Sequence, residues 1–213
     1  MTTFPIDPAP AAQPVDDGGL LRGALGLALV AMAGAGVVYP MLGVGLGQLL
    51  FAHGANGSLI ERDGRVLGSS LVAQPFAADG YVQPRPSAAD YDVMAVSGSN
   101  EARSNPELRA RIDAARATVA QRERVSPDAV PGDLLTQSGG GIDPHISPEA
   151  AAIQIARVAS ARGLDAAVVR AEVEAHVEPR QFGVLGQPRV NVLQLNLALD
   201  ALGAGRGDAV RGR

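Results

Sequence analysis

The thirty residues from Gly23 to Ala52, GALGLALVAMAGAGVVYPMLGVGLGQLLFA, contain no charged side chain. Twenty-one of them are apolar and seven are glycine. A helix needs about 20 apolar residues to cross a hydrocarbon core about 30 Å thick. We therefore predict a membrane anchor over residues 20–51, with the span at about residues 21–42, Tyr39 at the lipid–water interface and Pro40 near the end. The remainder, to Phe51, is expected to be a kinked extension.

The glycines of this stretch suggest a surface for a neighbouring helix, because small residues let two membrane helices approach closely. Gly43 and Gly47 form a GxxxG pattern, although a segment so rich in glycine also produces this pattern by chance. The candidate packing residues of the anchor are Gly36, Tyr39, Pro40, Gly43 and Gly47.

A cleaved signal peptide is the alternative interpretation of the same stretch. The tripeptide Ala31-Met32-Ala33 resembles a small-x-small cleavage site. The apolar run continues about twenty residues beyond it, however, whereas the apolar part of a signal peptide is usually 7–15 residues long. The length therefore favours an anchor.

The composition of the 213-residue chain excludes several classes of function. All 18 cationic residues are arginine, lysine and cysteine are absent, and the formal net charge is −4. A net acidic chain is poorly suited to neutralising phosphates, so no nucleic-acid partner is expected. Without lysine there is no Walker-type phosphate loop or Schiff base, and without cysteine there is no disulfide or thiolate metal site.

The rest of the chain predicts an α+β fold: one N-terminal transmembrane helix followed by a single soluble mixed α/β domain at residues 57–203. We expect a hairpin turning at Asp63-Gly64, then a loop rich in glycine, proline and serine. Helices are expected after the capping residues Asn105, Ser147 and Asp165, the second of them running to Gly163. The block 189–200 predicts a short strand leading into a helix. Residues 1–19 are expected to be a disordered proline-rich tail, and residues 204–213 a flexible tail.

Five arginines lie between Arg109 and Arg124, and Glu107, Asp113 and Glu123 are interleaved with them. The alternation of charge, with Glu107 and Arg111 at i,i+4 spacing, favours a solvated helix face over an anion-binding stripe.

One glycine-rich loop combines residue types that carry chemistry. Its candidate nucleotide-binding or partner-binding residues are Ser138, Gly139, Gly140, Gly141, Asp143 and His145. Ser138, Asp143 and His145 have the residue types of a hydrolase triad, so a membrane-anchored extracytoplasmic hydrolase using Ser138 and His145 is an alternative function. The backbone amides of residues 138–141 could instead form an anion nest, or the glycines could simply supply a tight turn.

A metal site is not expected, because the three histidines at positions 53, 145 and 176 lack the spacing of zinc ligands. In the interpretation that we favour, no residue of this chain has a catalytic role.

A series of motifs in a fixed order resembles the KdpC family, the C subunit of the bacterial Kdp potassium-transporting P-type ATPase. The resemblance covers about residues 20–202 and is carried by residues 38–40, 55–60, 68–76, 85–88, 97–100, 104–106, 141–147, 189–193 and 195–200. It implies an accessory subunit with no cofactor of its own in a high-affinity potassium uptake complex, in which another subunit hydrolyses ATP.

The resemblance also implies partners and a location. The partners are the potassium-translocating A subunit, the ATP-hydrolysing B subunit, the small F subunit and the lipid bilayer. The family is described as a catalytic chaperone that raises the affinity of the B subunit for ATP, and ATP binding by the C subunit itself has been proposed. The implied location is the bacterial inner membrane, with the N-terminus cytoplasmic and the soluble domain periplasmic; the residues alone leave this topology open.

The chain departs from the family pattern at three places. Residues 101–103 read Glu-Ala-Arg where members tend to have Leu-Gly-Pro, Gly140 replaces a common serine, and Gln187 replaces a common glutamate. The change at Gly140 places any hydroxyl-dependent ligand contact there in doubt.

Overall fold

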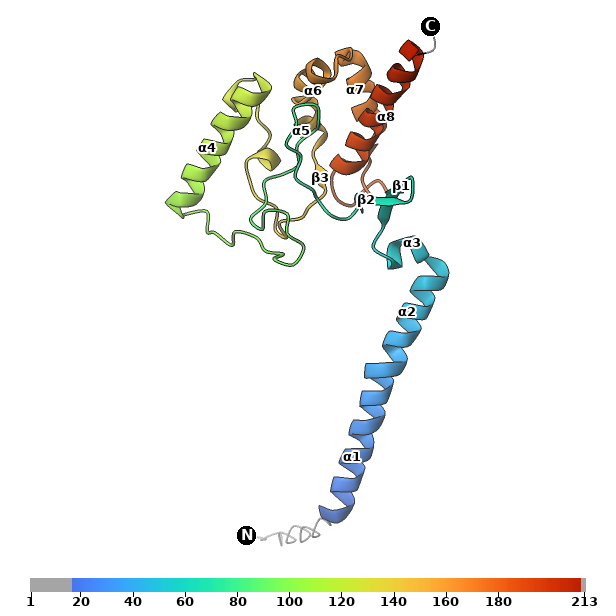
Figure 1. The fold of residues 1–213 in the computed structure, drawn as a ribbon. Helices are drawn as coiled ribbons and strands as arrows, with labels where there is room; N and C mark the ends of the chain where they lie inside the picture. The colour runs from blue at the N-terminus through green and yellow to red at the C-terminus, as the bar shows by residue number, and fades with distance from the viewer. Residues whose placement is uncertain (1–16, 212–213) are drawn as a thin grey trace, which may run out of the picture. The chain divides into compact units, whose positions relative to one another are not determined.

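The computed structural model describes residues 17–211, which form two compact units joined at Asn56–Gly57 (Figure 1). The disordered tail expected over residues 1–19 lies, up to residue 16, outside the described residues; Asp17 already begins a helix. Residues 212–213 of the expected C-terminal tail also lie outside them.

The first unit is one long apolar helix. It comprises α1 (Asp17–Ala33), a π-helical turn η1 (Gly34–Val38) and α2 (Tyr39–Leu50), followed by the short α3 (Ala52–Ala55). Helical structure therefore continues past Pro40 to Leu50, beyond the expected span. Proline lacks an N–H and its ring crowds the carbonyl four residues before it; for Pro40 that residue is Gly36, which lies in the wider π turn. In that turn the N–H of Tyr39 donates to the carbonyl of Gly34.

The second unit begins with the predicted hairpin, β1 (Leu59–Arg62) paired with β2 (Arg65–Ser69). Asp63 and Gly64 form its two-residue turn with φ values of 54° and 75°. Positive φ at both positions is the requirement of a type I′ turn, and it explains why an Asp-Gly pair stands there.

The three predicted helix starts are confirmed. The side chains of Asn105, Ser147 and Asp165 accept hydrogen bonds from backbone amides in the first turns of α4 (Pro106–Glu123), α5 (Pro148–Ala152) and α7 (Ala166–Ala175). The expectation of one helix from Ser147 to Gly163 was wrong, because the chain breaks at Ile153 and Gln154 before α6 (Ile155–Arg162). At the break, the amide of Gln154 bonds back only three residues, to Ala151.

A small antiparallel sheet lies among these helices, in the order β3 (His145–Ile146), β5 (Arg189–Asn191), β4 (Val177–Glu178). The predicted strand leading into a helix is also confirmed, since β5 runs directly into α8 (Val192–Arg211). Helix α8 thus includes residues 204–211, where a flexible tail was expected.

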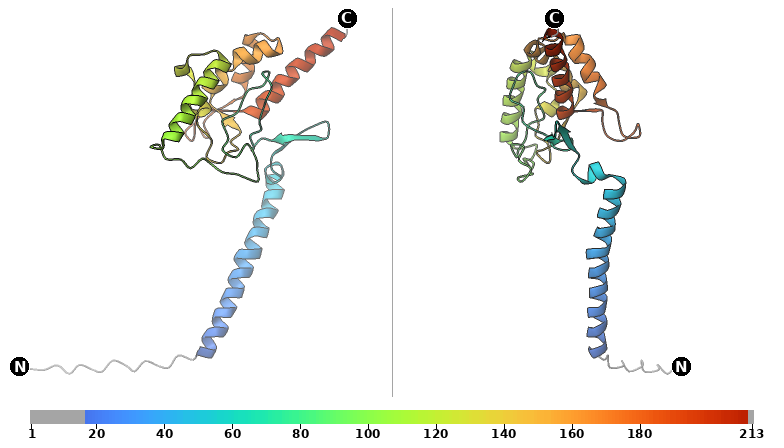
Figure 2. Two further views of the ribbon diagram at one scale, coloured as in Figure 1. Left: turned by 60° about the vertical axis from the view of Figure 1, so that its left-hand side comes forward. Right: turned by 45° about the vertical axis from the view of Figure 1, so that its right-hand side comes forward.

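The core of the second unit lies between α8, the sheet and helices α4 to α7 (Figure 2). Its largest fully buried apolar side chains are Leu195, Leu199, Val82, Val158, Val169, Val190 and Val192. Val82 belongs to the long irregular segment between β2 and α4, so that segment contributes to the core at this point.

Candidate functional site

The glycine-rich loop contacts two other segments of the irregular region. The amide of Ser138 donates to the carbonyl of Pro86 at 3.2 Å, and the Ser87 hydroxyl donates to the carbonyl of Gly141 at 2.6 Å. Gly98 approaches the same loop so closely that a Cβ there would lie 2.5 Å from the Gly139 carbonyl oxygen. Residues 85–87, 97–98 and 138–145, which we call the loop cluster, are therefore one structure built from distant parts of the chain.

Gly141 is the position where this arrangement most needs a glycine. Its φ is +74°, and a Cβ would lie 2.7 Å from the Ser97 carbonyl oxygen and 3.0 Å from the Ala89 Cβ. By contrast, a Cβ on Gly139 would meet nothing within 4 Å. The glycines of this loop thus have different roles, and Gly141 has a structural one.

Asp143 is the charged centre of the loop cluster. Its Oδ2 accepts from Nη1 of Arg85 at 2.9 Å, and its Oδ1 accepts from the backbone amide of His145 at 3.0 Å. Nδ1 of His145 lies 3.5 Å from the same Oδ1. Burial raises the pKa of Asp143, but the hydrogen bonds from His145 and the Arg85 guanidinium outweigh it and hold that pKa below its usual value.

The hydrolase arrangement is not assembled in the structure. Ser138 is buried, with 3% of its surface exposed. Among the described residues no hydrogen bond joins its hydroxyl to His145, which faces Asp143 instead. A nucleophilic serine needs a base within hydrogen-bond reach and an approach for substrate.

Only two of the four backbone amides of the predicted anion nest are available to bind an anion. Of the four amides of residues 138–141, that of Ser138 donates to Pro86 and that of Gly141 donates to the Ser138 carbonyl. The amides of Gly139 and Gly140 remain, and both residues are exposed. Two adjacent amides without a following helix are a weak anion site.

Two buried polar atoms of the loop cluster region lack a partner within residues 17–211: Nε of Arg85 and Oε1 of Gln137. Buried polar groups in native proteins are nearly always paired with protein, water or ligand. The loop cluster therefore has hydrogen-bonding capacity that the described chain itself does not satisfy.

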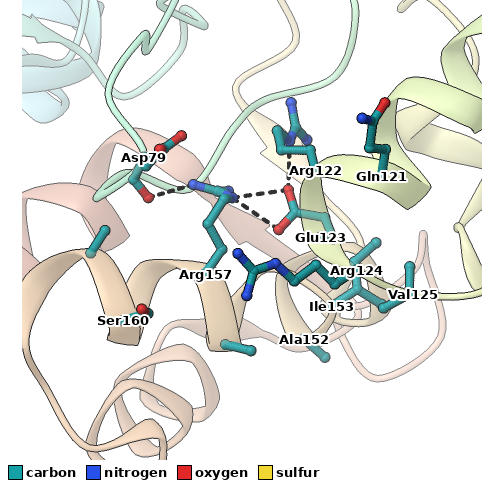
Figure 3. Close-up of a pocket in the computed structure, with 12 residues that line it drawn as sticks. Asp79, Gln121, Arg122, Glu123, Arg124, Val125, Ala152, Ile153, Arg157 and Ser160 are labelled. Carbon is teal, nitrogen blue, oxygen red and sulfur yellow. Dashed lines mark hydrogen bonds and ion pairs between the residues drawn. The ribbon is translucent and has the colours of Figure 1, made fainter.

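A second polar site was missed by the sequence analysis, which placed Glu123 on a solvated helix face. Glu123 is buried, and both of its carboxylate oxygens accept from Nε of Arg157, at 3.1 and 2.9 Å (Figure 3). Arg122 adds a third bond at 2.6 Å. The pair borders a cavity of about 700 Å³ between α4 and α6. Arg157 also donates to the carbonyls of Asp79 and Tyr81, so this network has a clear structural role.

The ion pair expected between Glu107 and Arg111 also differs in the structure. Arg111 of α4 pairs with Glu101, in the segment before the helix, and the expected i,i+4 pair with Glu107 is not formed. Hydrogen bonding to Glu101 raises the pKa of Arg111 further.

The candidate packing residues of the anchor lie on its uncovered helix. Gly36 lies in the π turn, while Tyr39, Pro40, Gly43 and Gly47 lie in α2. A Cβ on Gly36 or Gly43 would meet nothing within 4 Å, and on Gly47 it would meet only the Ala55 Cβ at 3.8 Å. Every residue from Gly19 to Leu46 is exposed.

For metals, no group of three His, Cys, Asp or Glu side chains suited to an ion occurs within residues 17–211.

Within residues 17–211, one apolar helix is long enough to cross a membrane and an α+β domain follows it, an arrangement that fits a single-pass membrane protein with one extramembrane domain. The chain matches the sequence model of the family described as KdpC, K⁺-transporting ATPase, c chain, over residues 21–201. It belongs to the KdpC family and is thereby a subunit of a potassium-transporting ATPase.

Relatives named potassium-transporting ATPase KdpC subunit share half or more of the aligned residues. One from Xanthomonas oryzae pv. oryzae is 57% identical over 195 residues, 92% of this chain and 93% of the relative. Another, from Gemmatimonas aurantiaca, is 54% identical over 172 residues, 79% of this chain and 86% of the relative. A third, from Shewanella putrefaciens, is 50% identical over 182 residues, 85% of this chain and 89% of the relative.

Proposed function

We propose that this chain is a non-catalytic accessory subunit that assembles with, and stabilises, the potassium-translocating A subunit and the ATP-hydrolysing B subunit of a high-affinity potassium uptake complex, together with the small F subunit. The observation that carries the proposal is the uncovered apolar helix in a chain of this family. Its glycine surface is open along its length, as a helix that packs against other membrane helices requires.

The length of the helix also supports assembly. The 32 residues Gly19–Leu50 rise about 48 Å at 1.5 Å per residue, against a hydrocarbon core of about 30 Å. Burying all of them would need a tilt of about 50°, beyond the usual range of about 0–40°. Part of this apolar helix therefore extends past the hydrocarbon core, where another protein can cover it.

The loop cluster is our candidate for the contact that acts on the ATPase subunit. Two unpartnered buried atoms, Nε of Arg85 in the cluster and Oε1 of Gln137 directly before its last segment, support a role in binding a ligand or partner. Raising the ATP affinity of the B subunit, in the manner of a catalytic chaperone, is the activity we assign to it. Binding of ATP by this chain itself is a separate proposal, supported only by the exposed amides of Gly139 and Gly140.

We further propose that the chain lies in the bacterial inner membrane with a cytoplasmic N-terminus and a periplasmic domain. This topology makes direct contact between the domain and cytoplasmic ATP impossible. A periplasmic domain and ATP binding by this chain are therefore mutually exclusive proposals. An alkaline phosphatase fused after Arg213 is active only in the periplasm and tests the topology directly.

Assembly is tested in cells that lack every other potassium uptake system. Deletion of this gene is expected to abolish growth at micromolar potassium, and the wild-type chain is expected to restore it. An affinity tag on the restored chain is expected to recover the A and B subunits from native membranes. Normal growth of the deletion strain, or recovery of the chain alone, overturns the proposal.

ATP affinity is measured on the same membranes. The KM for ATP of potassium-stimulated hydrolysis is expected to rise when this chain is absent. Photolabelling with an azido-ATP analogue identifies the chain that binds nucleotide: label on the B subunit alone supports the accessory role and overturns binding by this chain.

A further inference from the structure

The polar cavity between α4 and α6 has more positive than negative charge in its lining. Three arginines line it, Arg122, Arg124 and Arg157, against two carboxylates, Asp79 and Glu123. Its volume of about 700 Å³ lies within the range of about 300–1,000 Å³ that is usual for small-molecule sites. One excess positive charge in a concave site of this size favours a ligand that carries one negative charge.

Arg157 and Glu123 neutralise each other, so neither of them supplies the excess charge. The Glu123 side chain is fully buried, and both of its oxygens accept from Nε of Arg157. The other nitrogens of Arg157 are also used, since Nη1 donates to two backbone carbonyls and Nη2 to Oε1 of Gln154. Arg122 donates its Nε to Glu123. Among the described residues, Arg124 is therefore the arginine of the lining whose guanidinium has no protein partner.

Arg124 stands at a backbone position that favours glycine. It ends α4 with φ 56° and ψ 44°, the left-handed conformation in which helices commonly end on glycine. Its amide donates to the carbonyl of Ala120, a contact that the backbone of a glycine makes equally well. Within the described structure its guanidinium bonds to no carbonyl of the last helical turn, so the side chain takes no part in the cap. A side chain in this conformation is unfavourable compared with glycine, which points to a use for the arginine itself.

The side chain of Arg124 lies at the cavity and not away from it. It extends from the end of α4 toward Arg157 and α6 (Figure 3). The segment that contains α5 and α6 contributes a wall of small and apolar side chains, Ala152, Ile153, Ala156 and Ala161. Ser160 also lines the cavity, and its hydroxyl makes no hydrogen bond within residues 17–211. A cationic donor opposite an apolar wall suits an organic anion, whose charged group and apolar part need these two surroundings.

We propose that this cavity binds a small organic anion in which two oxygens share a single negative charge, a carboxylate or a phosphodiester, and that Arg124 holds the charged group. The planar guanidinium presents pairs of N–H donors that match two such oxygens. A nucleoside triphosphate, with its several negative charges, does not match one excess positive charge. The cavity is a different surface from the loop cluster, and the inference does not rest on the proposed function.

Binding is measured on the isotope-labelled full chain in detergent, with butyrate and diethyl phosphate as anionic probes and butyramide as the neutral control. NMR follows the amide resonances of Val125 and Ala156, two residues of the lining, as each probe is added. We expect saturable shifts with an anion and an affinity for butyramide at least about tenfold weaker. Saturation by butyrate alone identifies a carboxylate ligand, by diethyl phosphate alone a phosphodiester, and by both the group that they share. Equal affinity for butyramide, or no saturation by either anion while the protein stays folded, overturns the proposal.

Substitution of Arg124 separates ligand binding from a structural role. Arg124→Gly removes the guanidinium but suits the left-handed backbone, so its thermal midpoint by circular dichroism is expected to equal or exceed that of the wild type. Its affinity for the anion is expected to fall at least about tenfold. Arg109→Ala is the matched control, an exposed arginine of the same helix outside the lining, and is expected to leave the affinity unchanged. Unchanged affinity in Arg124→Gly, or an equal loss in Arg109→Ala, contradicts the proposal. Lost affinity together with a lower midpoint in Arg124→Gly would make the side chain structural and also contradict it.

Discussion

At the scale of single residues, Gly141 has the strictest requirement in the loop cluster. Its positive φ favours glycine, and the Ser97 carbonyl occupies the space of a side chain. An alanine therefore combines an unfavourable backbone conformation, costing about 1–2 kcal/mol, with a steric contact that costs a similar amount.

Gly141→Ala is expected to lower the free energy of unfolding of the chain by about 2–4 kcal/mol. Gly139→Ala, two residues earlier and facing open space, is the matched control and is expected to change it by no more than about 0.5 kcal/mol. Urea unfolding of the detergent-solubilised protein measures both. Equal stabilities of the two variants would show that the approach of Ser97 to Gly141 is not formed in solution.

Asp143 makes the stability of the same cluster depend on pH. Its pKa is lowered in the folded state, so the unfolded state binds more protons in the range where the carboxyl titrates. Its contribution to stability is fully present above the unfolded pKa of about 3.9 and is lost as the pH falls through the folded pKa.

The difference in unfolding free energy between the wild type and Asp143→Asn is therefore expected to be constant above about pH 5 and to shrink toward pH 2. Asp113→Asn supplies the control, because the Asp113 side chain is 72% exposed. Unfolding curves at a series of pH values give both differences. A difference for Asp143→Asn that stays constant down to pH 2 would contradict the role assigned to Arg85 and His145.

At the scale of elements, two buried amide side chains hold the irregular segment between β2 and α4 in place. Asn196 of α8 accepts from the amide of Val82 at 2.8 Å and donates to its carbonyl at 2.9 Å. Gln154, at the break between α5 and α6, bonds the amide and carbonyl of Gln83 in the same way, at 2.7 and 3.2 Å. Each side chain replaces the partner strand that this extended backbone lacks.

Asn196→Leu keeps the number and branching of the side-chain heavy atoms but leaves the amide and the carbonyl of Val82 buried without partners. The expected loss in free energy of unfolding is about 2–4 kcal/mol, since each unsatisfied group costs about 1–3 kcal/mol. Gln194→Leu changes an exposed residue of the same helix and is expected to change stability by less than about 0.5 kcal/mol. Hydrogen exchange at Val82 adds a local measurement, and unchanged protection there in Asn196→Leu would contradict the proposed clamp.

The elements that the sequence predicts well are those determined by neighbouring residues. Asn105 and Asp165 mark their helices because a cap acts within three residues, and Asp63-Gly64 marks its hairpin because the turn itself requires positive φ. The buried positions of Glu123, Gln154 and Asn196 were not predictable in this way. Each has a partner 34 to 114 residues away, and no local pattern distinguishes a buried polar side chain from a solvated one.

The candidate site shows the same division. The residues Ser138 to His145 stand out in the sequence by their types. Arg85 and Ser97 lie in motifs of the family resemblance, but only the tertiary structure shows that they contact this loop. The exposed turn at Phe182–Val184 was not anticipated, although Gly183 and Gly186 signal turns. Its exposure depends on what the rest of the domain leaves uncovered, which local sequence does not report.

At the scale of the whole molecule, the hydrophobic core belongs to the second unit. Among the described residues, those of the core lie between Ala73 and Leu202, and none comes from the anchor. The proposed function assigns the anchor two surroundings, lipid along one part of its length and protein along another. Its apolar length, greater than the hydrocarbon core, is what distinguishes these two parts.

The absence of native cysteine allows this division to be measured with single cysteines. Leu29 lies within the expected span and Leu49 near the end of α2; both side chains are more than half exposed on the isolated chain. In membrane vesicles that contain only this chain, Leu49→Cys is expected to react with a water-soluble maleimide at least about tenfold faster than Leu29→Cys, because thiolates form and react only where water reaches them. Mass spectrometry of the labelled chain gives both rates, and in detergent-denatured chains the two rates are expected to be equal. Equal slow rates in vesicles would mean that the bilayer accommodates the whole helix, so that a protein partner is not needed to cover residues 43–50.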